Sequence, residues 1–327
     1  MRAALCKQFG GPEVITVETI EDPKPGDDEA VIKVSAVALN FLDTLMIRGK
    51  YQYKIEPPFS PGVEVAGTIA ELGSGVTGFS VGDRVLAFIR MNGCRELVLT
   101  KASELIALPD GVDDKAASCF TVTYGTAVHA LGNRAKLQAG ETVAVLGASG
   151  GAGLAAVEIA KLMDARVIAA ASSAEKLEVC KAHGADEVIN YKDEDLKEQL
   201  KALTGGKGAD VIYDCVGGPY SEPALRATAW EGRFLVVGFA AGEIPKIPLN
   251  LLLLKGCAMV GVFWGEFATR DPAGHRRNIE QVIEWCASGK LKPHIDATYS
   301  LDQTRDALEA IDQRRATGKV IVLPQTA

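Results

Sequence analysis

The chain has 327 residues and a net charge of −7, with 47% apolar and 24% charged residues, proportions typical of a globular protein that is long enough for two domains. The acidic balance, without a basic run, argues against nucleic-acid binding, and the apolar run at residues 251–254 is too short to span a bilayer. The N-terminus shows no signal region, which predicts a cytoplasmic protein.

The first 110 residues predict a compact, mostly antiparallel β domain. Apolar and polar residues alternate over residues 30–37, and turn signals stand at Pro25-Gly26, Pro61-Gly62 and Gly82-Asp83. A helical pattern over residues 114–131 follows.

Strands and helices then alternate, which predicts a doubly wound parallel sheet. The six expected strands lie near residues 143–146, 166–170, 187–189, 210–214, 234–237 and 258–262. Two helical patterns, over residues 272–287 and 301–313, precede a closing strand at residues 319–322. This tail is too short to fold alone, so we expect it to pack on the first domain.

A glycine-rich turn joins the first of these strands to a helical pattern over residues 154–163. Gly147 permits a tight exit from the strand, Gly150 lets backbone N–H groups approach a phosphate, and Gly153 lets the helix pack closely on the sheet. Because the positive end of the helix then faces an anion, the turn predicts a dinucleotide-binding site.

The end of the second parallel strand favours NADPH over NADH. No Asp or Glu stands there to accept the ribose 2′-hydroxyl. Ser172 and Ser173 can donate to a 2′-phosphate, and Lys176 can neutralise it. Alternatively, Ser172 and Glu175 form a capping box and Lys176 is a solvated helix residue.

Several segments spread over the whole chain carry a family resemblance. They are Asn40-Phe41-Leu42-Asp43, Gly49-Lys50-Tyr51, Pro61-Gly62-Val63-Glu64-Val65-Ala66-Gly67, Val81-Gly82-Asp83-Arg84-Val85, the turn at 147–153 and Gly184-Ala185-Asp186. Together they resemble the quinone oxidoreductase (zeta-crystallin-like) branch of the medium-chain dehydrogenase/reductase superfamily. The resemblance implies an α/β protein with a GroES-like catalytic domain (1–122 and 264–327) and a Rossmann NADPH-binding domain (123–263).

We expect no catalytic metal. The zinc alcohol dehydrogenases of this superfamily carry Gly-His-Glu where this chain reads Gly62-Val63-Glu64, and valine cannot ligate a metal. The seven cysteines are scattered without a Cys-x-x-Cys pair, which predicts free thiols and neither disulfides nor structural zinc. Glu64 is then a structural carboxylate. Without a Lewis acid, hydride transfer to a conjugated acceptor, a quinone or an α,β-unsaturated carbonyl, fits better than alcohol/ketone exchange.

The resemblance also implies site residues. Asn40 and Tyr51 match catalytic-site residues that hydrogen-bond cofactor or substrate, although Leu45 replaces a tyrosine that family members often carry. The implied cofactor-binding residues are Thr126, Ser149, Gly150, Gly151, Ala152, Ser172, Ser173, Lys176, Tyr191, Gly238, Phe239 and Phe263. Each of five of these residues also has a structural alternative. Tyr51 and Tyr191 could be surface residues, and the Thr126 hydroxyl could bond the backbone of its own helix. Phe239 and Phe263 could pack in the core or in a dimer interface.

The sequence therefore predicts an NADPH-dependent reductase of quinones or enones whose partner is a small-molecule electron acceptor. One alternative is an enoyl-thioester reductase, because Arg270, His275, Arg276 and Arg277 could meet a CoA phosphate, although a solvated helix start explains them too. Another is an NADPH-binding structural or nucleic-acid-binding protein with little turnover. We also expect a homodimer joined along the apolar edge strand at residues 255–262.

Overall fold

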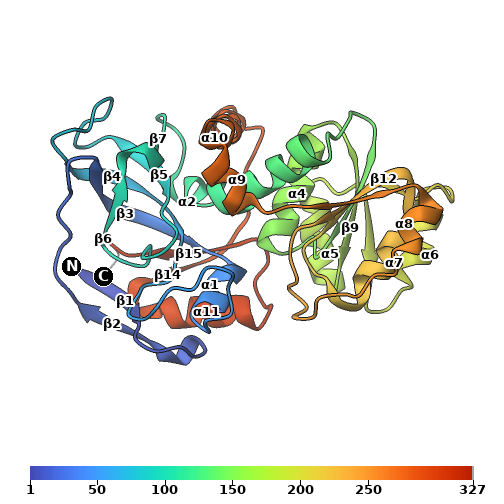
Figure 1. Ribbon diagram of the computed structural model, residues 1–327, viewed down its shortest axis with the longest axis horizontal. Helices are drawn as coiled ribbons and strands as arrows, with labels where there is room; N and C mark the ends of the chain where they lie inside the picture. The colour runs from blue at the N-terminus through green and yellow to red at the C-terminus, as the bar shows by residue number, and fades with distance from the viewer. Residues whose placement is uncertain (326–327) are drawn as a thin grey trace. The chain divides into compact units, whose positions relative to one another are not determined.

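The computed structural model describes residues 1–325 and contains two compact units (Figure 1). Unit 1 comprises Met1–Val122 and the chain from Ile279 onward, and unit 2 comprises Thr123–Asn278. The expected domains divide the chain at 122/123 and at 263/264. The units divide at the same first position, but their second division falls at 278/279, within the helix α10 (Pro272–Ala287).

Unit 1 is built on a seven-stranded sheet in the order β14-β15-β3-β4-β5-β7, with β6 paired to β3. The strands are β3 (Glu29–Leu39), β4 (Glu64–Leu72), β5 (Arg84–Phe88), β6 (Leu97–Lys101), β7 (Leu105–Ala107), β14 (Ile295–Ser300) and β15 (Lys319–Leu323). A separate hairpin joins β1 (Arg2–Cys6) to β2 (Ile15–Thr19), and the helices are α1 (Phe41–Met46), α2 (Asp114–Ala117) and α11 (Thr304–Asp312).

The expected antiparallel character of this region is confirmed, because β3 pairs antiparallel with β4, β6 and β15. The closing strand does return to the first domain, as expected from its length. Its register brings Val320 opposite Leu39, while Glu64 at the start of β4 lies opposite Ala38. The two pairings therefore bring the starts of β4 and β15 to the end of β3, where Asn40 begins α1.

Unit 2 is a parallel six-stranded sheet in the order β10-β9-β8-β11-β12-β13. The strands are β8 (Thr142–Leu146), β9 (Arg166–Ala171), β10 (Glu187–Asn190), β11 (Ala209–Asp214), β12 (Thr228–Val236) and β13 (Ala258–Gly261). The helices are α3 (Gly125–Val128), α4 (Gly151–Leu162), α5 (Ala174–Ala182), α6 (Leu196–Leu203), α7 (Ser221–Arg226), α8 (Asn250–Lys255) and α9 (Trp264–Arg270). The prediction of six parallel strands is confirmed.

Two local expectations differ from the structure in detail. The helical stretch expected over residues 114–131 does form, but not as one α-helix, because π-helical turns at Phe120–Tyr124 and His129–Arg134 flank α3. The apolar segment at 255–262 holds a shorter strand than expected, because Gly256 adopts a left-handed conformation with φ 57° and ends α8 there. None of the helices among residues 1–325 has the length and apolar character needed to cross a bilayer.

Candidate functional site

The glycine-rich turn forms an open helix N-terminus at the end of β8. Gly147 has φ +67°, and a Cβ on Gly153 would lie only 2.2 Å from the Gly147 carbonyl oxygen, so both positions require glycine. Gly150 is the N-cap of the 12-residue helix α4, where no side chain caps the first turn and no acidic residue stands in it. The N–H groups of this turn lack helical partners by geometry, so the turn fits an anion such as a pyrophosphate.

The end of β9 leads directly into α5, whose N-cap is Ser173. The Ser173 hydroxyl accepts a hydrogen bond from the Lys176 backbone N–H at 3.4 Å. The capping-box alternative, which placed Ser172 at the N-cap, is therefore wrong by one residue. Tyr191 directly follows β10, and its ring packs against that of Tyr220 with centroids 4.4 Å apart.

The remaining predicted residues of unit 2 follow other strand ends. Gly238 and Phe239 come just after β12, Phe263 comes just after β13, and Thr126 lies half-buried on α3. Phe239 and Phe263 are 37% and 43% exposed, so neither is a core residue. Because the sheet is parallel, the residues that follow its strands share one edge, and β8 and β11 there form the switch point at which the strand order reverses.

Asp214 organises the switch point at the end of β11. Its carboxylate accepts hydrogen bonds from the backbone N–H groups of Val216 at 2.8 Å and Gly217 at 2.9 Å, and from the Ser221 hydroxyl at 2.5 Å. Burial raises the pKa of Asp214 above its usual range, although these donors lower it. The carboxylate therefore fixes the loop after β11 beside the glycine-rich turn.

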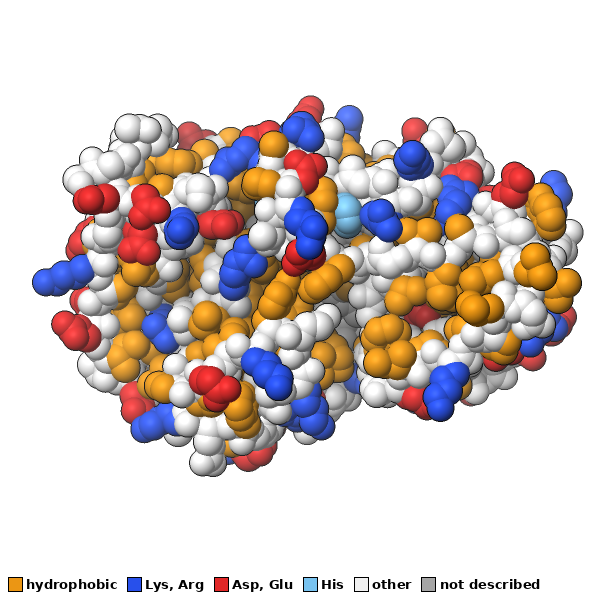
Figure 2. Space-filling model, viewed as in Figure 1, with side chains coloured by type: hydrophobic (Ala, Val, Ile, Leu, Met, Phe, Trp, Pro, Cys, Tyr) orange, Lys and Arg blue, Asp and Glu red, His pale blue; other side chains and the backbone are white. Residues whose placement is uncertain are grey.

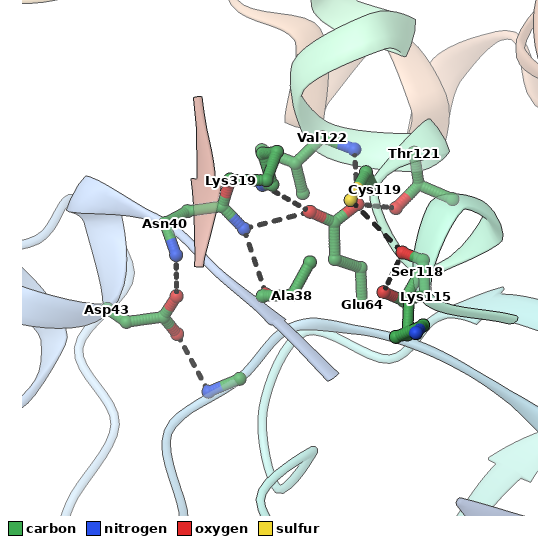
Figure 3. A network of polar contacts seen from close by, with 11 residues as sticks. Ala38, Asn40, Asp43, Glu64, Lys115, Ser118, Cys119, Thr121, Val122 and Lys319 are labelled. Carbon is green, nitrogen blue, oxygen red and sulfur yellow. Dashed lines mark hydrogen bonds and ion pairs between the residues drawn. The ribbon is translucent and has the colours of Figure 1, made fainter. Parts of the chain in front are cut away.

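In unit 1, Asn40 lies in a buried polar network rather than on an open surface (Figure 3). Its amide Nδ2 donates to Glu64 Oε1 at 2.9 Å and to the Ala38 carbonyl at 3.2 Å. Lys319 Nζ donates to Asn40 Oδ1 at 2.5 Å and to Glu64 Oε1 at 3.1 Å. The second Glu64 oxygen accepts from the Thr121 hydroxyl at 2.6 Å and the Val122 N–H at 2.8 Å. Glu64 therefore has the structural contacts that the sequence led us to expect.

Asp43 extends this network to the start of α1. Its two oxygens accept from the Asn40 and Gly62 backbone N–H groups, each at 2.8 Å. Complete burial raises the pKa of Asp43 to about 7, although these donors and Lys319 act in the opposite direction. Burial, with Tyr53 and Asp43 nearby, raises the pKa of the half-buried Tyr51 to about 12. Tyr51 therefore keeps its proton at neutral pH, and its hydroxyl can donate a hydrogen bond.

Sequence reasoning missed Lys319 and Thr121 as members of this network. The sequence does contain an indication of Lys319, because this charged residue directly precedes the apolar Val-Ile-Val of a buried strand. Asp43 also had one, since it stands three residues after Asn40 at a helix start, in the spacing of a capping box.

Two members of the basic cluster behind the enoyl-thioester alternative have other surroundings than a phosphate site. His275 is buried in edge-to-face contact with the Trp264 ring, and desolvation lowers its pKa to about 4, so its imidazole is neutral at pH 7. Arg270 is bound to Glu266 at 2.6 Å. On the face drawn in Figure 2, Lys and Arg side chains are interspersed with Asp and Glu.

No group of three or more His, Cys, Asp or Glu side chains within residues 1–325 is arranged to hold a metal ion. None of the seven cysteines, all within the described residues, forms a disulfide bond. A hollow of about 760 Å³ in unit 2 borders Tyr191 and Tyr220, but among the predicted cofactor residues it reaches only Tyr191.

Comparisons with known proteins agree with this architecture. Residues 26–155 match the alcohol dehydrogenase GroES-like domain family, and residues 151–288 match the zinc-binding dehydrogenase family. Quinone oxidoreductase-like protein 2 homolog of Nematostella vectensis is 39% identical over 98% of this chain and 88% of its own length. Quinone oxidoreductase of Rattus norvegicus is 33% identical over 99% of this chain and 98% of its own. The crystal structure of Escherichia coli quinone oxidoreductase complexed with NADPH matches with a TM-score of 0.89 and 27% identity, covering 99% of this chain and 100% of that one.

Fold and family matches thus define a two-unit protein with a GroES-like part and a Rossmann-type part. The chain belongs to the quinone oxidoreductase family of enzymes, a branch of the medium-chain dehydrogenase/reductase superfamily. The family predicted from the sequence motifs is confirmed.

Proposed function

We propose that this protein is an NADPH-dependent reductase that transfers hydride directly to quinones or α,β-unsaturated carbonyls without a metal. The proposal rests on the arrangement of two strand ends at one edge of the parallel sheet in unit 2. There the uncapped N-terminus of α4 and the strand end bearing Ser172 and Ser173 lie side by side, because β8 pairs with β9. NADPH, when bound, supplies the hydride from its nicotinamide ring.

The residues of unit 2 would hold the cofactor in three places. Residues 149–152 would bind the pyrophosphate, and Ser172, Ser173, Lys176 and Tyr191 the 2′-phosphate end. Thr126, Gly238, Phe239 and Phe263 would border the nicotinamide end. The Escherichia coli relative was solved in complex with NADPH, which supports the choice of cofactor.

The acceptor class is tested by following NADPH oxidation with the purified protein over a panel of quinones, enones and enoyl-CoA thioesters. We expect turnover with quinones or enones. Preference for the thioesters would instead identify an enoyl-thioester reductase. Turnover with no member of the panel would favour an NADPH-binding structural or nucleic-acid-binding protein. Titration with oligonucleotides at two salt concentrations checks the last alternative, since phosphate contacts weaken with salt.

Lys176→Ala is expected to weaken NADPH binding and to spare NADH. Loss of one charge-assisted phosphate contact costs on the order of 1.5–3 kcal/mol, roughly ten- to a hundredfold in Kd. Fluorescence titration of both cofactors measures the change, with Lys181→Ala, one turn or more further along α5 and paired to Glu178, as the matched control. Equal affinity of the unmutated protein for NADPH and NADH would contradict the assignment.

Tyr51→Phe is expected to lower kcat only modestly. The pKa of about 12 makes Tyr51 a poor acid at neutral pH, so we propose that it orients the acceptor and that solvent supplies the proton. The rate should fall by no more than the roughly 10²-fold typical of a weak general acid, and Asn40→Ala should lower it further. Steady-state kinetics with Tyr299→Phe, on β14, as the control measures the effect. Complete loss of turnover with normal NADPH binding would make Tyr51 the proton donor.

We further propose a homodimer that pairs β13 of two copies. β13 is the end strand of its sheet, and Trp230, Leu249, Leu253 and Leu254 in the same unit are each at least 70% exposed. Open strand edges and large exposed apolar side chains are typical of protein interfaces. Leu253→Glu is expected to weaken the dimer about tenfold or more in light scattering, since it buries a charge, whereas Leu99→Glu in unit 1 should not. An unmutated protein that is monomeric at micromolar concentration would refute the proposal.

A further inference from the structure

The Asn40 amide is held by a buried ion pair. Lys319 is 3% exposed, and Glu64 is fully buried. Both side chains hydrogen-bond to Asn40, whose Oδ1 accepts from Lys319 and whose Nδ2 donates to Glu64 (Figure 3). Lys319 and Glu64 also contact each other at 3.1 Å, so the three side chains form a closed triangle.

The hydrogen-bonding capacity of the Asn40 side chain is almost used up by this triangle. An amide has two N–H donors and an oxygen with two acceptor positions. Both donors are engaged, one by Glu64 Oε1 and one by the Ala38 carbonyl. Lys319 occupies one acceptor position at Oδ1. The capping box at the start of α1 also directs the Asp43 N–H toward this side chain, although that N–H bonds the Asn40 backbone carbonyl at 3.0 Å. The acceptor position that Oδ1 can offer a ligand is therefore the second one, beside this N–H and in the orientation that Lys319 imposes.

Stability alone is a weak reason to bury this pair. Both charges lose their hydration, and a buried ion pair is often no more stabilising than apolar residues of the same volume. An apolar pair would leave the amide free to rotate by half a turn, since its oxygen and nitrogen are of similar shape. The charged pair removes this freedom, because Lys319 can only donate and Glu64, when ionised, can only accept.

We propose that Lys319 is a positioning residue for hydride transfer, which together with Glu64 locks the Asn40 amide with its oxygen available as an acceptor. The inference rests on the proposed function, since it assigns Asn40 a role in that reaction. It adds that Asn40 receives a hydrogen bond from a donor on the cofactor or substrate and does not donate one to the acceptor oxygen.

Steady-state kinetics of Lys319→Met, Asn40→Ala and the double variant test the proposal, with a soluble naphthoquinone as the acceptor. Lys319→Met is expected to lower kcat by about ten- to a hundredfold, the scale on which small misplacements of reacting groups act. KM for both substrates and Kd for NADPH should change by less than about threefold. In the Asn40→Ala background, Lys319→Met should lower kcat by less than about threefold further, because a residue that acts through Asn40 then has nothing left to position. Lys101→Met, at an exposed lysine on β6, is the matched control.

Three outcomes would overturn the inference. They are an unchanged kcat in Lys319→Met, effects of the two substitutions that multiply in the double variant, and a loss confined to KM. If Lys319→Met fails to fold because Glu64 is left unpaired, the paired variant Glu64→Gln/Lys319→Met removes both charges together and carries the same expectation for kcat. Wild-type kcat in that folded variant would equally contradict the inference. An unmutated protein that reduces no quinone would instead remove the proposed function, and this inference with it.

Discussion

Gly150→Ala is expected to weaken NADPH binding while the stability of the apoprotein stays nearly unchanged, whereas Gly153→Ala is expected to destabilise the fold itself. A Cβ on Gly150 would meet only the Gly147 carbonyl oxygen at 3.5 Å, an ordinary contact, and its φ of −80° suits alanine. In the proposed binding mode, the new methyl group would stand where the pyrophosphate approaches the backbone. Kd for NADPH should rise at least about tenfold, and the free energy of unfolding should change by less than about 1 kcal/mol.

In Gly153→Ala the new Cβ would lie 2.2 Å from the Gly147 oxygen and 2.7 Å from the Ala148 Cα, so the backbone must move. Overpacking of this kind costs about 1–3 kcal/mol. Chemical unfolding of the apoproteins and cofactor titration measure the two effects separately. Wild-type NADPH affinity in Gly150→Ala would mean that the turn does not hold the pyrophosphate, and wild-type stability in Gly153→Ala would mean that the turn can shift without cost.

Glu64→Ala is expected to be among the most destabilising single substitutions in unit 1. It leaves the Lys319 ammonium buried without its carboxylate, and it removes the acceptor of the Thr121 hydroxyl and the Val122 N–H. Breaking a buried ion pair from one side costs about 3–5 kcal/mol. Denaturant unfolding measures the change, with Glu18→Ala, which removes an exposed pair with Lys7, as the control, expected to stay within about 1 kcal/mol. A loss of similar size in both variants would show that Glu64 is not the centre of the network.

The local structure at the proposed nucleotide-binding edge could be predicted because its signals are local. Gly147, Gly150 and Gly153 lie within seven residues of one another, directly after an apolar strand, and the expected strand, turn and helix all form there. The missing carboxylate at the end of β9 could likewise be read from adjacent residues. The family resemblance then supplied the order of the remaining elements.

The network around Asn40 could not be predicted because its members are distant in sequence. Glu64 lies 24 residues from Asn40, and Lys319 lies 255 residues from Glu64. Only the registers of β3 with β4 and with β15 bring them together, and register depends on tertiary pairing. The π-helical turns around α3 were missed for a different reason, because the apolar pattern of such a turn does not differ enough from that of an α-helix to be recognised.

The proposed function is tested most directly by the rate of quinone-dependent NADPH oxidation by the purified protein, measured with and without a strong metal chelator and compared with the rate for NADH. We expect turnover that is faster with NADPH and unchanged by the chelator, since Val63 stands where the zinc alcohol dehydrogenases carry a histidine. No turnover with any quinone, or a rate that the chelator removes and zinc restores, would contradict the proposed function.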